Sequence, residues 1–234
     1  MKDFFPKVSI IIPVENIEEA TYQSINSVLS QTYQNLEIIV ISREENLSTL
    51  KNKYEEKCMY QSISSFDMVK ALNVGLKKKT GEYVTFLFNN DIYGPNTIEK
   101  ELLLFSSSNN IDFVFSSDLE DVKDKLNNKI QNNEFDNLIL LTGIIPLSGI
   151  MFRKELLNKG FDEKYKTTFI ERKVEEISSK SSFAVIDNQL VKENAPTYKE
   201  AELIDLWKDV LKKTNEKEIV NAYETKTNFY KEGI

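Results

Sequence analysis

Apolar residues along the first half of the chain follow two patterns in turn, which predict alternating strands and helices. Continuous apolar runs rich in β-branched residues are typical of strands covered on both faces. The predicted strands are 8–14, 36–42, 60–64, 83–88 and 111–115. Between them, apolar residues return at the spacing of one helical face. The predicted helices are 15–31, a short helix after a cap at Asn46, 66–79 after a cap at Ser65, and 97–105. This alternation predicts an α/β fold with a mainly parallel central sheet flanked by helices.

The second half of the chain is less regular. Its expected elements are a strand and a short helix within 143–161, a strand at 181–191, and amphipathic helices at 201–213 and 218–230. The Asn-rich stretch 127–137 is typical of an exposed loop. We expect residues 1–195 to form one domain, with residues 196–234 as a C-terminal helical extension packed on it.

Composition excludes several kinds of partner and chemistry. The net charge of −7 provides no basic field for duplex nucleic acid, so no nucleic-acid partner is expected. Cys58 is the single cysteine, which excludes an internal disulfide and suits a reducing compartment. Because the chain contains no histidine, any acid–base chemistry has to use Asp, Glu, Lys or Tyr.

Neither a secretory signal nor a transmembrane segment is expected. The amino terminus is charged and runs directly into the first predicted strand. The longest apolar stretch, 138–152, is interrupted by Thr, Gly, Pro and Ser and is too short to cross a bilayer. We therefore expect a cytoplasmic protein.

Polar residues gather where three of the predicted strands end, at Pro13–Asn16, Ser42–Glu45 and Phe88–Asp91. In an open parallel sheet, ligands bind at the carboxyl ends of the strands. The stretch FLFNND (86–91) ends an apolar run in two amides and one carboxylate. The pattern therefore predicts a site at this edge of the sheet.

Four stretches of the chain resemble family 2 glycosyltransferases with the GT-A fold. They are VSIIIPVEN (8–16), SINSVLSQTYQNLEIIVIS (24–42), ALNVGLKKKTGEYVTFLFNNDIYGPNTIEK (71–100) and SGIMFRKELLNKGFDE (148–163). The resemblance implies transfer of a sugar from a UDP- or dTDP-linked nucleotide sugar to an acceptor hydroxyl. It also implies Mn²⁺ or Mg²⁺ held by an Asp-x-Asp motif, and a carboxylate base in the second half of the chain. The cation would neutralise the departing diphosphate while the base removes the acceptor proton.

The positions that match the family's nucleotide contacts depart from its pattern. The family's Pro-x-Tyr-Asn corresponds to Pro13, Glu15 and Asn16, which are either retained nucleotide-sugar contacts or a turn before a helix. The family's Asp-Asp-Gly-Ser corresponds to SREE (42–45), so Ser42 and Arg43 stand at its two aspartates. The second aspartate contacts the base in the family, whereas Arg43 is a donor only. Arg43 would instead meet a phosphate, or lie in a solvated loop.

The metal motif is changed at two of its three carboxylates. The family's F-L-D-x-D-D corresponds to FLFNND, so that Phe88 and Asn90 replace aspartates and Asp91 survives. Mg²⁺ and Mn²⁺ prefer anionic oxygen ligands. We expect Asp91 to hold a cation weakly, or no metal to bind. The amides of Asn89 and Asn90 remain candidate nucleotide-sugar contacts.

Two further positions bear on catalysis. Asn73 is a nucleotide-sugar contact or a structural helix residue, and Leu72 beside it stands where the family commonly has an Arg. The family's Glu-Asp pair best matches Glu171-Arg172, which puts Arg172 at the base, whereas a shift of one residue puts Glu171 there. Glu171 is thus the candidate base, with an acid favoured by the helix dipole as the alternative.

Two hypotheses follow from this pattern of changes. In the first, the chain is catalytically impaired and serves as an accessory or scaffold, with an active glycosyltransferase or a glycan as partner. The aromatic residues within 201–230 would then offer an interface, unless they cover the domain's own core. In the second, the chain is an active but divergent glycosyltransferase that uses Asp91, or neutral and basic groups, for the diphosphate and Glu171 as base.

Overall fold

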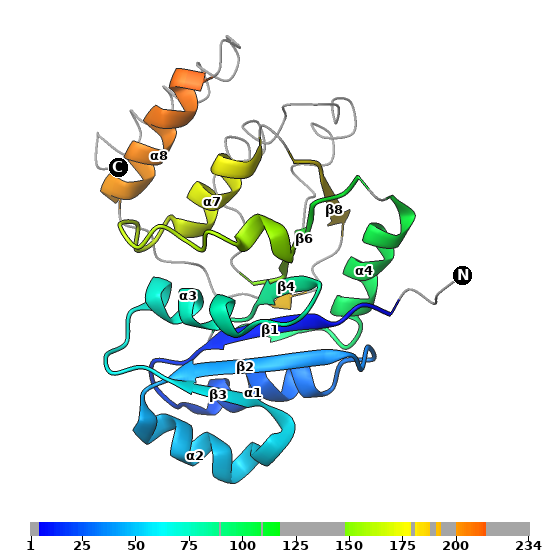
Figure 1. Cartoon of the computed structure of the whole chain (residues 1–234), viewed down its shortest axis with the longest axis vertical. Helices are drawn as coiled ribbons and strands as arrows, with labels where there is room; N and C mark the ends of the chain where they lie inside the picture. The colour runs from blue at the N-terminus through cyan, green and yellow to red at the C-terminus, as the bar shows by residue number, and fades with distance from the viewer. Residues whose placement is uncertain are drawn as a thin grey trace. The chain divides into compact units, whose positions relative to one another are not determined.

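The computed structural model describes residues 5–88, 90–108, 110–117, 148–178, 181–187, 191–192 and 200–213 (Figure 1). The chain forms two compact units. The first unit comprises Met1–Asp118, Pro146–Phe161 and Ser182–Ala195, and the second comprises Leu119–Ile145, Asp162–Ser181 and Pro196–Ile234.

The first unit contains the strands and most of the described helices. Its strands are β1 (Val8–Pro13), β2 (Leu36–Ser42), β3 (Met59–Ser62), β4 (Tyr83–Phe86), β5 (Ile92–Tyr93), β6 (Phe113–Ser117), β7 (Ile150–Arg153), β8 (Phe183–Asp187) and β9 (Val191–Lys192). Its helices are α1 (Glu19–Leu29), α2 (Glu44–Tyr54), α3 (Met68–Lys78) and α4 (Thr97–Ser107), with short 3₁₀ turns η1 (Glu55–Lys57) and η2 (Lys154–Leu157).

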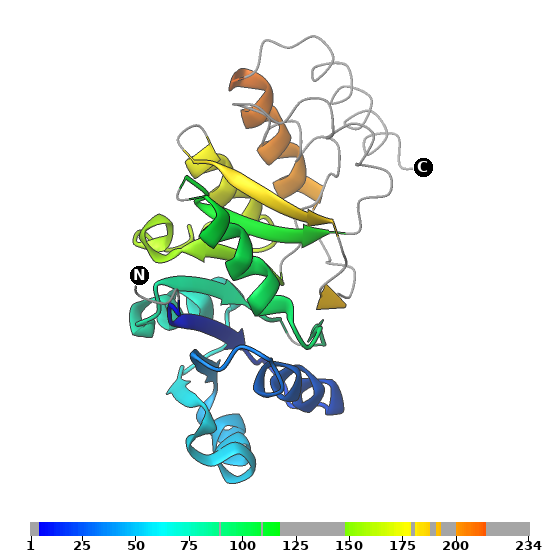
Figure 2. The ribbon, with the colours of Figure 1, turned by 90° about the vertical axis from the view of Figure 1, so that its right-hand side faces the viewer.

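Seven of these strands form one sheet in the order β3-β2-β1-β4-β7-β6-β8. Neighbouring strands are parallel except at β7, which runs antiparallel to both β4 and β6. Figure 2 shows β6 and β8 side by side at the far edge of this sheet. Strands β5 and β9 pair separately. The predicted α/β fold with a mainly parallel sheet is confirmed. The apolar pattern does not predict the reversed direction of β7.

The central strands are buried because helices cover both faces of the sheet. On one face, Ile10 and Ile12 of β1 join a cluster that includes Ile25 of α1. On the other face, α3 lies directly against β1 and β2. A methyl group on Gly75 of α3 would come within 2.5 Å of Ile11 Cγ2, so only glycine allows this approach. The carboxyl ends of β1, β2 and β4 are thereby held at one edge.

The predicted caps of two helices are wrong. α2 begins at Glu44 with Arg43 as its N-cap, and Asn46 lies inside the helix, where its amide bonds the strand ends instead. α3 begins at Met68, and its cap is Asp67, whose Oδ1 accepts a 3.0 Å hydrogen bond from the Lys70 N–H. A carboxylate there satisfies one of the unpaired donors of the first helical turn.

In the second unit, the described part includes helices α7 (Phe169–Ser178) and α8 (Glu200–Lys213). α8 confirms the helix predicted at 201–213. The side chain of Trp207, the stretch 127–137 and residues 214–234 lie outside the described residues, so the proposed interface within 201–230 and the division at residue 195 stay predictions. Among the described residues, no helix has the length and apolar character needed to cross a membrane.

Candidate functional site

Side chains from β2 and α2 connect the carboxyl ends of β1 and β2 by hydrogen bonds. The buried hydroxyl of Ser42 donates a 2.5 Å hydrogen bond to the Val14 carbonyl. The Asn46 amide donates to the Glu15 carbonyl at 2.9 Å and to Ser42 Oγ at 3.0 Å. Ser42 therefore has a structural role at this edge of the sheet. The side chains of Glu15 and Asn16 are exposed to solvent.

Arg43 provides the positive charge at this edge. Its Nη2 donates to the Glu15 carbonyl and to Asn16 Oδ1, each at 3.4 Å, and its Nε lies 3.2 Å from Glu45 Oε1. The Arg43 side chain is 39% exposed. These contacts are long and at the surface, so the guanidinium is held loosely. The structure thus brings together four predicted residues, Glu15, Asn16, Ser42 and Arg43, next to Pro13 at the end of β1.

The loop that follows β4 is locked by its own carboxylate. Asp91 N–H donates a 3.1 Å hydrogen bond to the Phe88 carbonyl, which closes a tight turn. Ser148 Oγ accepts from the Phe88 N–H at 2.9 Å and donates to Asp91 Oδ2 at 2.6 Å. Asp91 is only 5% exposed, and Ser148 is fully buried. The surviving carboxylate of the motif therefore has a role in holding this turn.

The other motif positions do not supply anionic ligands. The Phe88 side chain is buried. Asn90 is exposed and has φ +77°, a left-handed conformation that Asn adopts more readily than most residues. Asn89 lies outside the described residues. Asn90 is therefore suited to the conformation of this turn, whether or not its amide contacts a ligand.

Two buried groups lie beneath the loop. The Tyr93 hydroxyl donates to the Phe86 carbonyl at 2.8 Å and shares a 2.9 Å hydrogen bond with Thr85 Oγ1. Burial raises the pKa of Tyr93 well above its ordinary value, with the Glu101 carboxylate adding to the effect. Glu101 of α4 is fully buried, and burial raises its pKa well above its ordinary value as well.

Asn73 uses both of its polar groups to fix a backbone segment. Its Oδ1 accepts from the Phe161 N–H at 2.8 Å, and its Nδ2 donates to the Phe161 carbonyl at 2.9 Å. Gly160, next to Phe161, has φ +69°, and a Cβ there would lie 2.6 Å from Asn73 Oδ1. These contacts favour a structural role for Asn73 over the alternative of a nucleotide-sugar contact.

The candidate base lies in the second unit. Glu171 is on the first turn of α7 and is 0% exposed. Arg172 beside it is also buried and forms a 2.6 Å ion pair with Asp209 of α8. Its guanidinium lies 4.5 Å from the centre of the Tyr165 ring. Arg172 thus joins the two helices that are described in this unit. Glu171, the other member of the pair, is a buried acid.

The chain segment before α7 is fixed by a carboxylate from α8. Glu202 Oε2 accepts hydrogen bonds from the N–H groups of Lys166, Thr167 and Thr168 at 2.9, 2.8 and 3.3 Å. Burial acts to raise the pKa of Glu202, but these hydrogen bonds outweigh it and hold the pKa below its ordinary value. Sequence reasoning missed Glu202 and Ser148 because each acts on residues distant in the chain.

The residues at the motif do not fit a divalent cation. Phe88 has no ligand atom, Asn90 is neutral, and Asp91 already accepts the Ser148 hydrogen bond. Over the part of the chain that the structure describes, no three Cys, Asp or Glu side chains converge as a metal site would require. Hard divalent cations need several oxygen ligands, preferably anionic.

Comparison with known proteins identifies the family. Residues 9–167 match the model of glycosyl transferase family 2. An uncharacterized glycosyltransferase of Rickettsia typhi is 36% identical over 113 residues, which cover 47% of this chain and 36% of the relative. One from Nostoc is 26% identical over 171 residues, covering 66% of this chain and 53% of the relative. The matches thus span about half or less of the length of these relatives.

Solved structures show the same fold at low identity. The mannosyltransferase PcManGT of Pyrobaculum calidifontis, in complex with GDP-Man and Mn²⁺, superposes with a TM-score of 0.71 at 13% identity, covering 96% of this chain and 70% of that one. TarS 1–349 of S. aureus, in complex with UDP, gives 0.64 at 16% identity over 87% of this chain and 64% of that one. With the family model covering more than half of its residues, the chain belongs to glycosyl transferase family 2 and has the GT-A fold.

Proposed function

We propose that this chain is a catalytically impaired member of its family that acts as an accessory or scaffold in glycan or glycoprotein assembly. The observation that carries the proposal is the state of the motif loop. Two of its carboxylate positions hold Phe88 and Asn90, and the third, Asp91, is engaged by Ser148 within the turn. Metal-assisted departure of a diphosphate needs a cation held by the protein, and these residues do not provide its ligands.

Two other positions support the same proposal. Arg43, at the place of the family's base-contacting aspartate, reverses the hydrogen-bonding character there and pairs with Asn16 and Glu45. Glu171 is fully buried, whereas a general base has to come within hydrogen-bond reach of the acceptor hydroxyl. The partner proposed for the scaffold is an active glycosyltransferase or a glycan. A cytoplasmic location is part of the proposal and rests on the single cysteine.

A second candidate function is an active, divergent glycosyltransferase. The observation that favours it is Arg43, a partly exposed cation at the carboxyl edge where nucleotide ligands bind in such sheets. A guanidinium can meet a diphosphate without a metal. In this case Asp91 would support donor binding and Glu171 would act as base.

Calorimetric titration with UDP-, dTDP- and GDP-sugars, with and without Mn²⁺, separates the two. The scaffold proposal expects no metal-dependent binding, and micromolar binding that requires Mn²⁺ would overturn it. The enzyme candidate is overturned when none of the nucleotide sugars binds. GDP-sugars belong in the series because one of the structural relatives was solved with GDP-Man.

Should metal-independent binding occur, variants assign the groups. Arg43→Ala should weaken binding at least ~10-fold if its guanidinium meets the diphosphate. Lys51→Ala is the matched control, because Lys51 is an exposed cation on the same helix that pairs with Glu44. Asp91→Ala should reduce binding, and Glu171→Gln should reduce turnover alone.

A further inference from the structure

Arg43 has unused hydrogen-bond donors at the carboxyl edge of the sheet. Its Nη2 makes two contacts of 3.4 Å, to the Glu15 carbonyl and Asn16 Oδ1, and its Nε lies 3.2 Å from Glu45 Oε1. Among the described residues, Nη1 of Arg43 has no hydrogen-bond partner. A guanidinium holds five N–H groups in a rigid plane and can donate two parallel hydrogen bonds to neighbouring acceptors. Arg43 can therefore engage a ligand without losing a short hydrogen bond.

The strand order places Arg43 where a nucleoside is contacted in similar sheets. β1 lies between β2 and β4, so the strand order reverses next to β1. Ligands of open α/β sheets bind outside the carboxyl ends of the strands at such a reversal. In the sheets of this kind that bind dinucleotides, a residue at the end of the second strand contacts the nucleoside. Arg43 directly follows β2 and holds the corresponding position.

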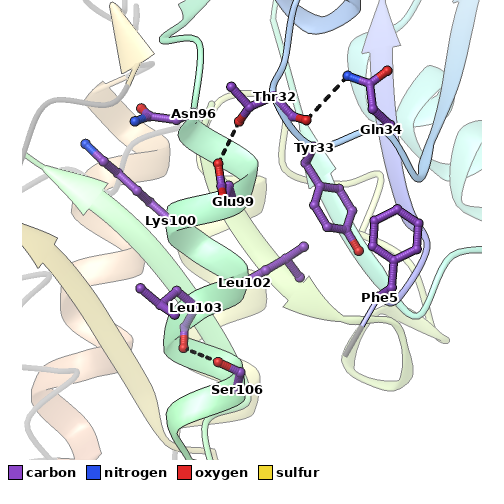
Figure 3. Close-up of a pocket in the computed structure, with 10 residues that line it drawn as sticks. All are labelled: Phe5, Thr32, Tyr33, Gln34, Asn96, Glu99, Lys100, Leu102, Leu103 and Ser106. Atoms are coloured by element: carbon purple, nitrogen blue, oxygen red, sulfur yellow. Dashed lines mark hydrogen bonds between the residues drawn. The ribbon is translucent and has the colours of Figure 1, made fainter. Parts of the chain in front are cut away.

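The groove of about 770 Å³ shown in Figure 3 is a different surface. It is lined by Phe5, which precedes β1, and by Tyr33 and Gln34, which precede β2. Glu15 and Arg43, in contrast, follow these two strands. The groove therefore lies at the ends of the strands where the chain enters the sheet, and the nucleotide belongs at the opposite ends.

The charges around Arg43 disfavour an anion as its ligand. Glu45 lies against the guanidinium, and Glu15 and Glu44 are also exposed next to it. The pairing of Glu44 with Lys51 is long, at 3.5 Å, and lies at the surface. Three carboxylates around one guanidinium repel a diphosphate, whereas they do not repel an uncharged ring. The local charge therefore favours a nucleobase over a diphosphate as the group that meets Arg43.

The hydrogen-bonding character of Arg43 then selects among the bases. Guanine presents two adjacent acceptors, O6 and N7, to which Arg commonly donates a pair of hydrogen bonds. Cytosine presents the adjacent acceptors O2 and N3. In uracil, the N3–H donor separates the two carbonyl acceptors, and in adenine the amino group lies beside N1 and N7. A side chain that only donates can thus form two parallel hydrogen bonds with guanine or cytosine, but not with uracil or adenine.

We propose that Arg43 selects nucleotide sugars whose base has two adjacent acceptors, namely guanine or cytosine. The inference rests on the second candidate function, in which the chain binds a nucleotide sugar. The guanidinium donates two parallel hydrogen bonds to the base, and the diphosphate is bound by other groups. The UDP-linked donors implied by the family resemblance are then the poorer ligands.

Calorimetric titration of the full chain with GDP, ADP, CDP and UDP, without added metal, tests the proposal. These four ligands share the ribose and the diphosphate and differ in the base alone. GDP and ADP form a matched purine pair, and CDP and UDP form a matched pyrimidine pair. In at least one pair, the base with adjacent acceptors should bind at least ~10-fold more tightly, as expected from one bidentate base contact. The pair that shows the preference identifies the base.

Two variants of Arg43 separate a base contact from a diphosphate contact. Arg43→Lys keeps the positive charge but loses the parallel donors, so the preference should fall to less than ~3-fold. Arg43→Ala should weaken the preferred nucleotide at least ~10-fold and leave its matched partner within ~3-fold of wild type. Lys51→Ala is the control, because it removes an exposed cation of the same helix and should keep the preference. Circular dichroism verifies that each variant is folded.

The possible failures are distinguishable. Equal binding within both pairs, or a preference for UDP or ADP, overturns the inference and leaves the second candidate function in place. Equal weakening of all four ligands by Arg43→Ala, with Arg43→Lys unchanged, shows that Arg43 meets the diphosphate and likewise overturns the inference alone. If none of the four nucleotides binds, the inference and the second candidate function fail together.

Discussion

The Ser148 hydroxyl donates a 2.6 Å hydrogen bond to Asp91 Oδ2 in a buried environment, joining the motif loop to the residue that leads into β7. Ser148 Oγ also accepts a hydrogen bond from the Phe88 N–H. The one carboxylate that survives from the family's motif is thus part of a buried hydrogen-bonded turn. Its retention has a structural reason that is separate from metal binding.

Ser148→Ala should destabilise the protein by about 1–3 kcal/mol, because it leaves the buried Asp91 carboxylate and the Phe88 N–H without this partner. Urea unfolding followed by circular dichroism measures the change. Ser107→Ala, at an exposed hydroxyl of α4, is the control and should stay within about 0.5 kcal/mol of wild type. Equal stability of the two variants would show that the turn does not depend on Ser148.

Asn90→Ala should cost about 1 kcal/mol, since the left-handed conformation at φ +77° is unfavourable for a residue with an ordinary side chain. Asn90→Gly should be neutral or slightly stabilising, because glycine reaches this conformation without strain. Thermal unfolding of the two variants makes the comparison. The prediction fails if glycine is the more destabilising of the two.

Glu101 should make stability fall as pH rises. Burial raises the pKa of folded Glu101 above its ordinary value of 4.5, so the carboxyl contributes fully below pH 4.5. Between pH 4.5 and the folded pKa, the unfolded state loses the proton while the folded state keeps it. The contribution of the carboxyl therefore decreases steadily as the pH rises through this window. The difference in unfolding free energy between wild type and Glu101→Gln should change by up to ~1.4 kcal/mol per pH unit in this window. Glu56→Gln, at an exposed acid, should show no such trend.

Glu202 should have the opposite pH dependence. Its folded pKa lies below the ordinary value of 4.5, because the hydrogen bonds from Thr167, Lys166 and Thr168 outweigh its burial. Its contribution is therefore present above pH 4.5 and is lost as pH falls through the folded pKa. Glu202→Gln should destabilise the protein by about 1–2 kcal/mol at pH 7 and by less at pH 3. The control is Asp205→Asn, at an exposed acid of the same helix, and an equal effect there would contradict the assignment.

The apolar pattern predicted the parallel strands of the sheet, but neither the direction of β7 nor the contacts at the edge of the sheet. Continuous β-branched runs such as 8–14 fold as fully buried strands, as predicted. The cap at Asn46 was mispredicted because a cap preference of about 1 kcal/mol yields to tertiary bonds such as that of Asn46 to the Glu15 carbonyl. At α3, Asp67 is the cap instead of Ser65 and bonds the Lys70 N–H.

Contacts between residues distant in the chain account for most of what the sequence left open at the candidate site. The changed motif could be read directly, since Phe88 and Asn90 are visible in FLFNND. The anchoring of Asp91 by Ser148 joins residues 57 apart, and the clamp of Asn73 on Phe161 joins residues 88 apart. No local spacing encodes such pairs, so a polar residue beside a site is easily taken for a ligand contact.

The position of β7 between β4 and β6 sets an order for assembly during synthesis. Strands β3, β2, β1 and β4 can pair as soon as Phe86 has been made, but the outer edge of β4 has no strand beside it until Ile150–Arg153 arrives. β6 is made earlier, yet it reaches β4 only through β7. Any fragment that ends between Ser117 and Ile150 therefore leaves an open strand edge, the kind of surface that recruits other chains into aggregates. A truncated version should therefore extend through β8, which covers the outer edge of β6.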